Sequence, residues 1–203
     1  MPPVARTLII ANVVMYLLQG VGMDALIVHL ALWPIASAGA FGVPSFEPWQ
    51  LVSYAFLHGG LVHLFFNMFA LYMFGSEIER LFGTRFFLQF YFASVISAAL
   101  SHLVVTAWIG GPPVPTIGAS GGVYGLLLAY GMYFPRRTVV LLIPPIPMPA
   151  RVFVIVFAAL ELWFGVTGTL SGVAHFAHLG GMLGGWLMIQ YRRRGFPFSS
   201  PRR

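Results

Sequence analysis

The feature that most restricts this chain is a series of apolar runs, each near the length that crosses a lipid bilayer. Six runs can be marked along the 203 residues, at 6–21, 58–75, 86–108, 120–134, 152–168 and 173–191. A membrane-spanning helix needs about 20 apolar residues, so the fourth run is short. Only 8% of the residues are charged, against about 25% in a soluble domain. We therefore predict an all-α, polytopic membrane protein with six transmembrane helices in a single domain, residues 1–203.

The stretch between residues 22 and 50 differs from these runs. It is apolar, but Pro34, Pro44 and Pro48 interrupt it, and it contains Asp24 and Glu47. We predict a long structured first loop that lies in the membrane interface and carries one or two short helices. A seventh span through residues 25–32 is the alternative, although that segment is too short alone. An Ala-Ser-Ala sequence at 36–38 resembles a signal-peptidase site, but it lies too far from the first run, so we expect a retained first span.

The positive charges indicate how the spans are oriented. All eleven are arginines: Arg6, Arg80, Arg85, Arg136, Arg137, Arg151, Arg192, Arg193, Arg194, Arg202 and Arg203. With six spans, each falls at a terminus, in the second–third link or in the fourth–fifth link, and these segments share one side. Cytoplasmic segments are enriched in Lys and Arg, so we predict cytoplasmic termini and a basic tail at about 192–203. The net charge of +6 then reflects topology and anionic lipid, and we expect no nucleic-acid partner.

The residue types present restrict cysteine and metal chemistry. The chain has no cysteine, which excludes disulfides and a thiolate nucleophile. The His-Glu-x-x-His pattern of membrane zinc proteases is absent. His175 and His178 could share a metal, but no third ligand is evident, so we expect neither a metal nor another cofactor. Glu161 lies in the fifth run without an evident role, and it could pair with a buried polar group or face an aqueous cavity.

Three polar clusters stand out inside the apolar runs, where ionisable side chains are costly and are candidates for function. They are HGGLVHLFFN at 58–67, GASGGVYG at 118–125 and HFAHLGGMLGG at 175–185. In the first cluster His63 and Asn67 are four residues apart and share one helical face, whereas we expect a structural role for His58.

Ser120 is the candidate nucleophile, because it follows a Pro-rich loop and opens a helix. The amino end of a helix presents unpaired N–H groups and a partial positive charge, which stabilise a developing oxyanion. A serine hydroxyl also needs a base, and a histidine from another span could supply it.

Glycine spacing favours His178 over His175 as that base. Glycines at 181 and 185 lie one and two turns after His178, and the fourth run has a matching pair at 121 and 125. Such small-xxx-small pairs let membrane helices pack closely. Close packing of the fourth and sixth spans would bring His178 to Ser120.

Taken together, the three clusters resemble the rhomboid family of intramembrane serine proteases, in its minimal six-span bacterial form. The resemblance covers roughly residues 49–191. It implies a serine endopeptidase with Ser120 as nucleophile and His178 as general base, a dyad with no acidic third member. It also implies no metal and no cofactor.

The same resemblance implies supporting roles for four further residues. His63 and Asn67 would form an oxyanion hole with the backbone N–H of Ser120. Gly118 would shape the loop under the substrate carbonyl, and Tyr124 would pack against the ring of His178. The family often has Trp-Arg in the first loop, whereas this chain has glutamine after Trp49.

Substrates and location follow from the resemblance as well. The substrate would be a transmembrane segment of another protein, entering between the second and fifth spans past Phe153, Phe157 and Trp163. The six-span form points to a bacterial inner membrane. The alternatives are a catalytically silent, client-binding relative and a small transporter, but an intact Ser/His pair disfavours the first and the lack of an internal repeat disfavours the second.

Overall fold

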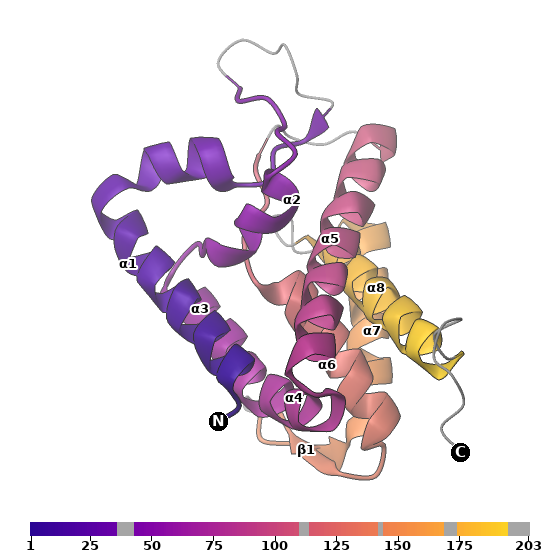
Figure 1. Cartoon of the computed structure of the whole chain (residues 1–203). Helices are drawn as coiled ribbons and strands as arrows, with labels where there is room; N and C mark the ends of the chain where they lie inside the picture. The colour runs from indigo at the N-terminus through magenta and orange to yellow at the C-terminus, as the bar shows by residue number, and fades with distance from the viewer. Residues whose placement is uncertain (36–42, 110–113, 142–143, 169–173, 195–203) are drawn as a thin grey trace.

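The computed structural model describes residues 1–35, 43–109, 114–141, 144–168 and 174–194, and it is mostly helical (Figure 1). The elements are α1 Pro3–Leu30, α2 Gln50–Ser53, the 3₁₀ turn η2 Tyr54–Phe56, α3 Leu61–Ala70, the π-helical turn η3 Leu71–Gly75, α4 Ser76–Phe82, α5 Thr84–Ile109, α6 Ser120–Tyr133, β1 Thr138–Val140, β2 Pro147–Pro149, α7 Ala150–Thr167 and α8 His175–Arg193. Each of the six apolar runs contains or overlaps a helix. The antiparallel pair of β1 and β2, which places Thr138 opposite Pro149, was not predicted.

Four helical segments in the described part of the chain are long and apolar enough to cross a membrane. They are Pro3–Leu30, Leu61–Phe82, Thr84–Trp108 and Ala150–Thr167. The second of them joins α3, η3 and α4. Helix α6 has only 14 residues, and neither α6 nor α8 is among these four segments. Six spans therefore stay a prediction.

The first helix corrects the predicted boundary of the first run. It extends beyond residue 21, because α1 continues to Leu30 across a kink at Gly22, where φ is −145° and ψ is 48°. Residues 23–30 turn across one end of the molecule (Figure 1). At 1.5 Å per residue this segment is about 12 Å long, too short for the alternative seventh span. The Ala-Ser-Ala sequence lies outside the described residues.

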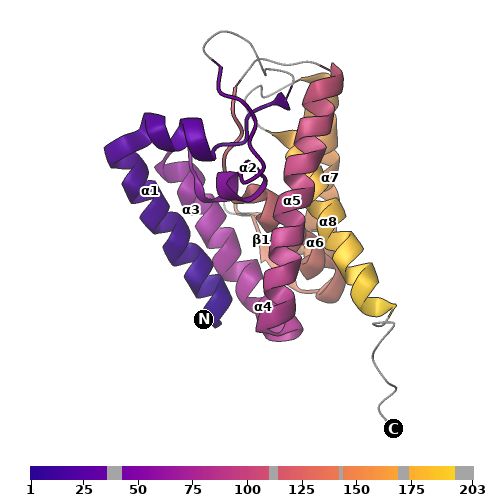
Figure 2. The ribbon, with the colours of Figure 1, turned by 45° about the horizontal axis from the view of Figure 1, so that its top comes forward.

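One end of the bundle collects the amino terminus and α4 (Figures 1 and 2), and Figure 1 shows the β1–β2 pair at the same end. The buried carboxylate of Glu79 accepts the N–H groups of Val4 at 3.0 Å and Ala5 at 2.7 Å. It thereby satisfies donors that the first turn of α1 leaves unpaired, next to the positive end of the helix dipole. Arg137, just after α6, pairs with Glu77 at 2.8 Å. The start of α1, the first turn of α4 and the segment just after α6 are thus joined at the arginine-rich end.

Helix α8 packs against both α5 and α6 through glycines. A Cβ atom added to Gly181 would lie 2.0 Å from the carbonyl oxygen of Gly121 on α6. On the neighbouring face of α8, a Cβ atom on Gly180 would lie 2.4 Å from Ser101 Oγ, and one on Gly184 would lie 2.5 Å from Ser97 Cβ. Both faces therefore admit only glycine at these positions, and the backbones approach as small-xxx-small pairs allow.

The segment between α1 and α3 is fastened beside the start of α6. Leu32 and Thr116 exchange two backbone hydrogen bonds, and the N–H of Gly118 donates to the carbonyl of Tyr54 at 3.0 Å. The buried side chain of Gln19 binds the backbone of His58 through both its amide nitrogen and its oxygen. The glutamine that follows Trp49 is also buried, and its oxygen accepts the N–H of Trp33. These contacts fix the loop that precedes Ser120.

Candidate active site

Ser120 and His178 lie side by side at the end of the bundle opposite the arginines. Ser120 is the first residue of α6, with Ala119 as its cap, and His178 lies in the first turn of α8. His178 Nε2 is 2.9 Å from Ser120 Oγ. The glycine contacts between α6 and α8 allow this approach. The geometry agrees with the packing that the glycine spacing predicts.

Tyr124 holds the imidazole of His178 from one side. It lies one turn after Ser120 on α6, and its ring stacks on His178 with centroids 4.2 Å apart and planes inclined by 6°. The residue His178 is 9% exposed. A stacked, nearly buried imidazole has little freedom to rotate, so the stack fixes the plane in which its nitrogens point.

His63 covers the loop just before Ser120. The backbone N–H of Gly59 donates to His63 Nδ1 at 3.3 Å, so in the neutral ring Nε2 carries the proton. A Cβ atom on Gly118 would lie 2.8 Å from His63 Nε2 and 3.8 Å from Ser120 Oγ. Gly118 also has φ +129°, a conformation that strains any L-residue. Glycine is therefore required here both by space and by backbone angle.

Asn67 lies one turn beyond His63 on α3 and is buried. Its side-chain nitrogen donates to the carbonyl oxygen of His63 at 2.9 Å. The structure thus places Asn67 beside His63, as its spacing predicts, with one amide hydrogen engaged by its own helix.

His58 is buried, with only 1% of its surface exposed, and its ring centroid lies 5.0 Å from that of His63. Burial, reinforced by the neighbouring His63 ring, lowers the pKa of His58 from 6.5 to about 4. The folded protein therefore holds this ring neutral near pH 7, which fits the structural role expected for it.

Glu161 corrects the expectation that His178 lacks an acidic neighbour. Glu161 Oε1 lies 3.0 Å from His178 Nδ1, and Oε2 lies 2.6 Å from His175 Nδ1. The hydroxyl of Tyr124 donates a short hydrogen bond to Oε1. A carboxylate in a membrane span is a signal in itself. Nothing in the sequence, however, shows that it faces the last span.

Glu161 also corrects the statement that His175 and His178 have no evident third metal ligand. Ligand atoms of Glu161, His175 and His178 lie within 4.8 Å of one another. Two imidazoles and a carboxylate are a donor set that zinc accepts. In this structure, however, the imidazoles approach the carboxylate at hydrogen-bond and ion-pair distances, so direct contacts account for the cluster.

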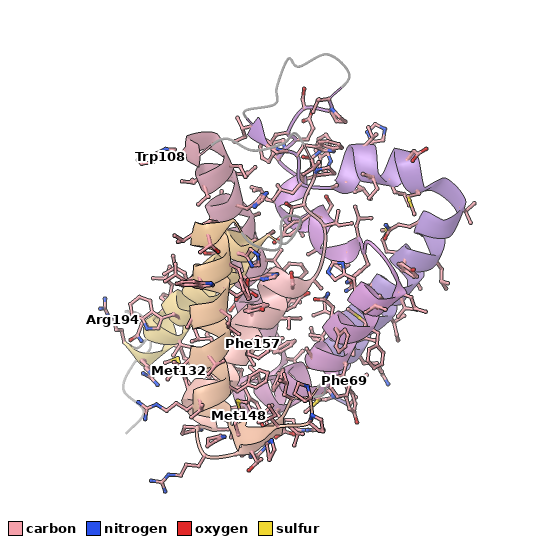
Figure 3. All side chains as sticks on the ribbon, turned by 180° about the vertical axis from the view of Figure 1, so that it is seen from behind. Phe69, Trp108, Met132, Met148, Phe157 and Arg194 are labelled. Carbon is pink, nitrogen blue, oxygen red and sulfur yellow. The ribbon has the colours of Figure 1, made fainter. Side chains whose placement is uncertain are left out.

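A groove of about 350 Å³ separates α3 and η3 from α7 and reaches Tyr124. Figure 3 views this side, with Phe69 labelled on α3 and Phe157 on α7. Both line the groove together with Phe153, whose ring stacks on Phe157 at 4.3 Å. Trp163, which we also expected at the entrance, is 65% exposed and does not line the groove.

Comparison with known proteins agrees with this arrangement. A model of the Rhomboid domain matches residues 45–195. "Rhomboid protease GluP" of Bacillus subtilis is 32% identical over 142 residues, covering 69% of this chain and 25% of that protein. "RHOMBOID-like protein 4" of Arabidopsis thaliana is 35% identical over 143 residues, covering 70% and 33%. "Putative rhomboid protease YdcA" of B. subtilis is 29% identical over 160 residues, covering 78% and 75%.

The match thus spans a quarter to a third of the first two relatives and three quarters of the third. The region that matches the domain includes α3, α6 and α8, the helices that carry His63, Ser120 and His178. The chain belongs to the rhomboid family of integral membrane proteins.

Proposed function

We propose that this protein is an intramembrane serine endopeptidase that cleaves transmembrane segments of other membrane proteins. The observation that carries the proposal is the 2.9 Å approach of His178 Nε2 to Ser120 Oγ at the amino end of α6. A serine oxygen, an imidazole nitrogen and a helix amino terminus in contact are the parts that acyl transfer requires.

In the first half-reaction Ser120 Oγ attacks the carbonyl carbon of the scissile peptide, and its proton passes to His178 Nε2. The carbonyl oxygen becomes an oxyanion beside the backbone N–H of Ser120 and the side chains of His63 and Asn67. His63 offers Nε2–H because its Nδ1 is occupied by the N–H of Gly59. Preorganised donors of this kind typically each contribute about 10²–10³ in rate.

The tetrahedral intermediate then expels the amine, which takes the proton from His178, and an ester to Ser120 remains. In the second half-reaction His178 removes a proton from water, and the hydroxide attacks the ester carbon. The C–O bond to Ser120 breaks and the serine recovers its proton from His178. Two peptide ends, a carboxylate and an amine, are the products, and neither half-reaction uses a cofactor.

We propose that the substrate segment reaches Ser120 through the groove between α3 and α7. The groove is lined by apolar side chains and has Tyr124, the neighbour of His178, at one wall. An apolar groove open between two membrane helices suits an unwinding transmembrane segment. Phe153 and Phe157, rather than Trp163, would control access.

The arrangement of charges supports an orientation with cytoplasmic termini. The amino end of α1, the short helix α4 and the end of α6 meet where the arginines lie. The helices bearing Ser120, His63 and His178 all begin at the opposite end. By the positive-inside rule, we propose that the site lies nearer the outer face. We propose a bacterial inner membrane as the location.

Labelling of the serine tests the proposal directly. The purified protein in detergent would be exposed to a fluorescent fluorophosphonate, with Ser120→Ala and His178→Ala beside it. Labelling should require both side chains, and cleavage of a reporter transmembrane segment in liposomes should stop in Ser120→Ala. A folded wild-type protein that neither labels nor cleaves, yet still captures the reporter segment, would favour the client-binding alternative.

A further inference from the structure

Glu161 is a buried carboxylate in the apolar run of α7, where α6, α7 and α8 meet. It is 8% exposed, and side chains from both neighbouring helices surround it. Tyr124 donates to one oxygen, and His175 Nδ1 lies 2.6 Å from the other. Burying a carboxylate costs several kcal/mol unless it is paired. A residue of this cost needs a role that an apolar side chain could not fill.

His178 lies between Glu161 and the candidate nucleophile Ser120 and contacts both. Glu161 Oε1 lies 3.0 Å from His178 Nδ1, while the other ring nitrogen lies 2.9 Å from Ser120 Oγ. The Nδ1–H direction does not point straight at the carboxylate, so the pair is within ion-pair distance without an aligned hydrogen bond.

The tautomer of His178 is what this contact controls. For Nε2 to accept the serine proton, the neutral ring must carry its proton on Nδ1. A carboxylate acceptor next to Nδ1 favours that tautomer and stabilises the imidazolium that forms when the serine attacks. The Tyr124 stack fixes the plane of the ring, and the carboxylate fixes which edge faces Ser120.

We infer that Glu161 is a positioning residue that completes a Ser120–His178–Glu161 array and supports His178 as the base. The inference rests on the proposed function. It also assigns α7 a second task, because the helix that lines the access groove carries the group that orients the base.

A purely structural role is the competing interpretation. Glu161 also joins α7 to α8 through His175, so its loss could act by loosening the helices. Kinetics and ring spectroscopy separate the two roles, because a loosened bundle lowers thermal stability without setting the position of one proton.

The test uses the full chain with Glu161→Gln, which removes the charge at nearly constant volume, and Glu161→Asp, which keeps the charge but withdraws it by one methylene. Glu77→Gln is the matched control, since it makes the same chemical change at the arginine-rich end. Fluorophosphonate labelling and reporter cleavage would be measured with a metal chelator present. We expect kcat to fall on the order of 100-fold in Glu161→Gln with little change in KM. Glu161→Asp should lose about tenfold, and Glu77→Gln should match wild type.

Nitrogen-15 NMR of histidine-labelled protein supplies a readout that does not depend on activity, with the His178 signal assigned from His178→Ala. The wild-type ring should carry its proton on Nδ1, and Glu161→Gln should lose this preference. If Glu161→Gln does not fold, Glu161→Asp serves for both measurements.

Unchanged kcat and an unchanged tautomer in a folded variant would overturn the inference and leave the proposed function standing. An inactive wild type would instead count against the proposed function, while the tautomer measurement would still decide whether Glu161 orients His178.

Discussion

The two helices that flank α6 are attached to it in opposite ways. Helix α8 meets α6 backbone to backbone, since a Cβ atom on Gly181 or Gly185 would fall 2.0 Å or 3.1 Å from glycine atoms of α6. Helix α7 approaches α6 closely at Gly131, near its first turn, and contacts α6 and α8 again through Glu161. Between these contacts its side chains line two grooves, one facing α3 and one of about 360 Å³ that includes Met132 and Arg151.

The difference gives the two helices separate tasks: α8 fixes the contact between Ser120 and His178, and α7 borders the groove that reaches Tyr124 beside them. Helices that pack closely through glycine faces can hardly shift relative to one another. Helices α5, α6 and α8 can therefore hold Ser120 and His178 in contact. Grooves forfeit dispersion contacts, so of these two helices α7 can move at the lower cost. The polar contacts of Glu161 oppose that movement at the level of the site.

Gly181→Ala should have the largest effect. The new methyl group would lie 2.0 Å from the carbonyl oxygen of Gly121, a backbone atom that cannot turn aside. Helices α6 and α8 would have to separate, and His178 would leave Ser120. We expect serine labelling to fall at least about 100-fold, since a displacement near 1 Å has this cost. Thermal unfolding in detergent should show a loss of about 1–3 kcal/mol.

Gly20→Ala is the matched control for that substitution. Gly20 lies in α1, and a Cβ atom there meets nothing within 4 Å. The same added methyl group should leave labelling unchanged and stabilise the helix slightly. Equal effects of the two substitutions would mean that the glycine face of α8 has no special importance.

The loop that joins α1 to α3 should make stability depend on pH. His58 has a folded pKa of about 4 against 6.5 when it is unfolded, so the unfolded chain binds more protons between these values. Its contribution is complete above pH 6.5 and is lost as the pH falls toward 4. The loss is at most about 3 kcal/mol. Thermal unfolding from pH 7.5 to 4 measures it.

His58→Asn removes the titrating ring while keeping the backbone hydrogen bonds to Gln19. Its stability should fall less steeply with acid than that of the wild type. Parallel curves for the two proteins would contradict the assignment and shift the acid sensitivity to another histidine.

The sequence predicted those parts of the molecule that depend on one helix or on glycine spacing. Helices α5 and α6 follow the runs 86–108 and 120–134 closely, because long apolar runs in a membrane have few alternatives. The contact of Ser120 with His178 follows from matched glycine pairs, which specify both the helices that meet and the faces they use. Gly118 was expected in the loop under the substrate, and its φ of +129° explains why no other residue fits.

What the sequence did not reveal depends on rotations and bends between elements. Glu161 meets His178 only because of how α7 is turned about its axis, and the apolar residues around Glu161 do not encode that angle. The kink at Gly22 joins two helical stretches, and a glycine alone does not distinguish a bend from an end. The strand β2 begins and ends with Pro147 and Pro149, which lack N–H groups, so its sequence argued against a strand.

The aromatic pair on α7 should show the smallest but most specific effect. Phe157 lines the groove toward α3 and stacks on Phe153, so Phe157→Ala widens the access path without touching Ser120 or His178. If access limits turnover, cleavage of a transmembrane reporter should rise roughly 3- to 10-fold. A small fluorophosphonate does not need the groove, so its labelling rate should stay within about twofold.

Trp163→Ala provides the comparison within the same helix. Trp163 is a large aromatic residue like Phe157, but it is 65% exposed and lies outside the groove. Its removal should leave both reporter cleavage and labelling unchanged. A rise in cleavage for both variants would mean that α7 responds to any loss of bulk, and the groove would then not be the access path. A parallel rise in labelling with Phe157→Ala would point instead to a loosened site, contrary to the separation between a rigid α8 and a movable α7.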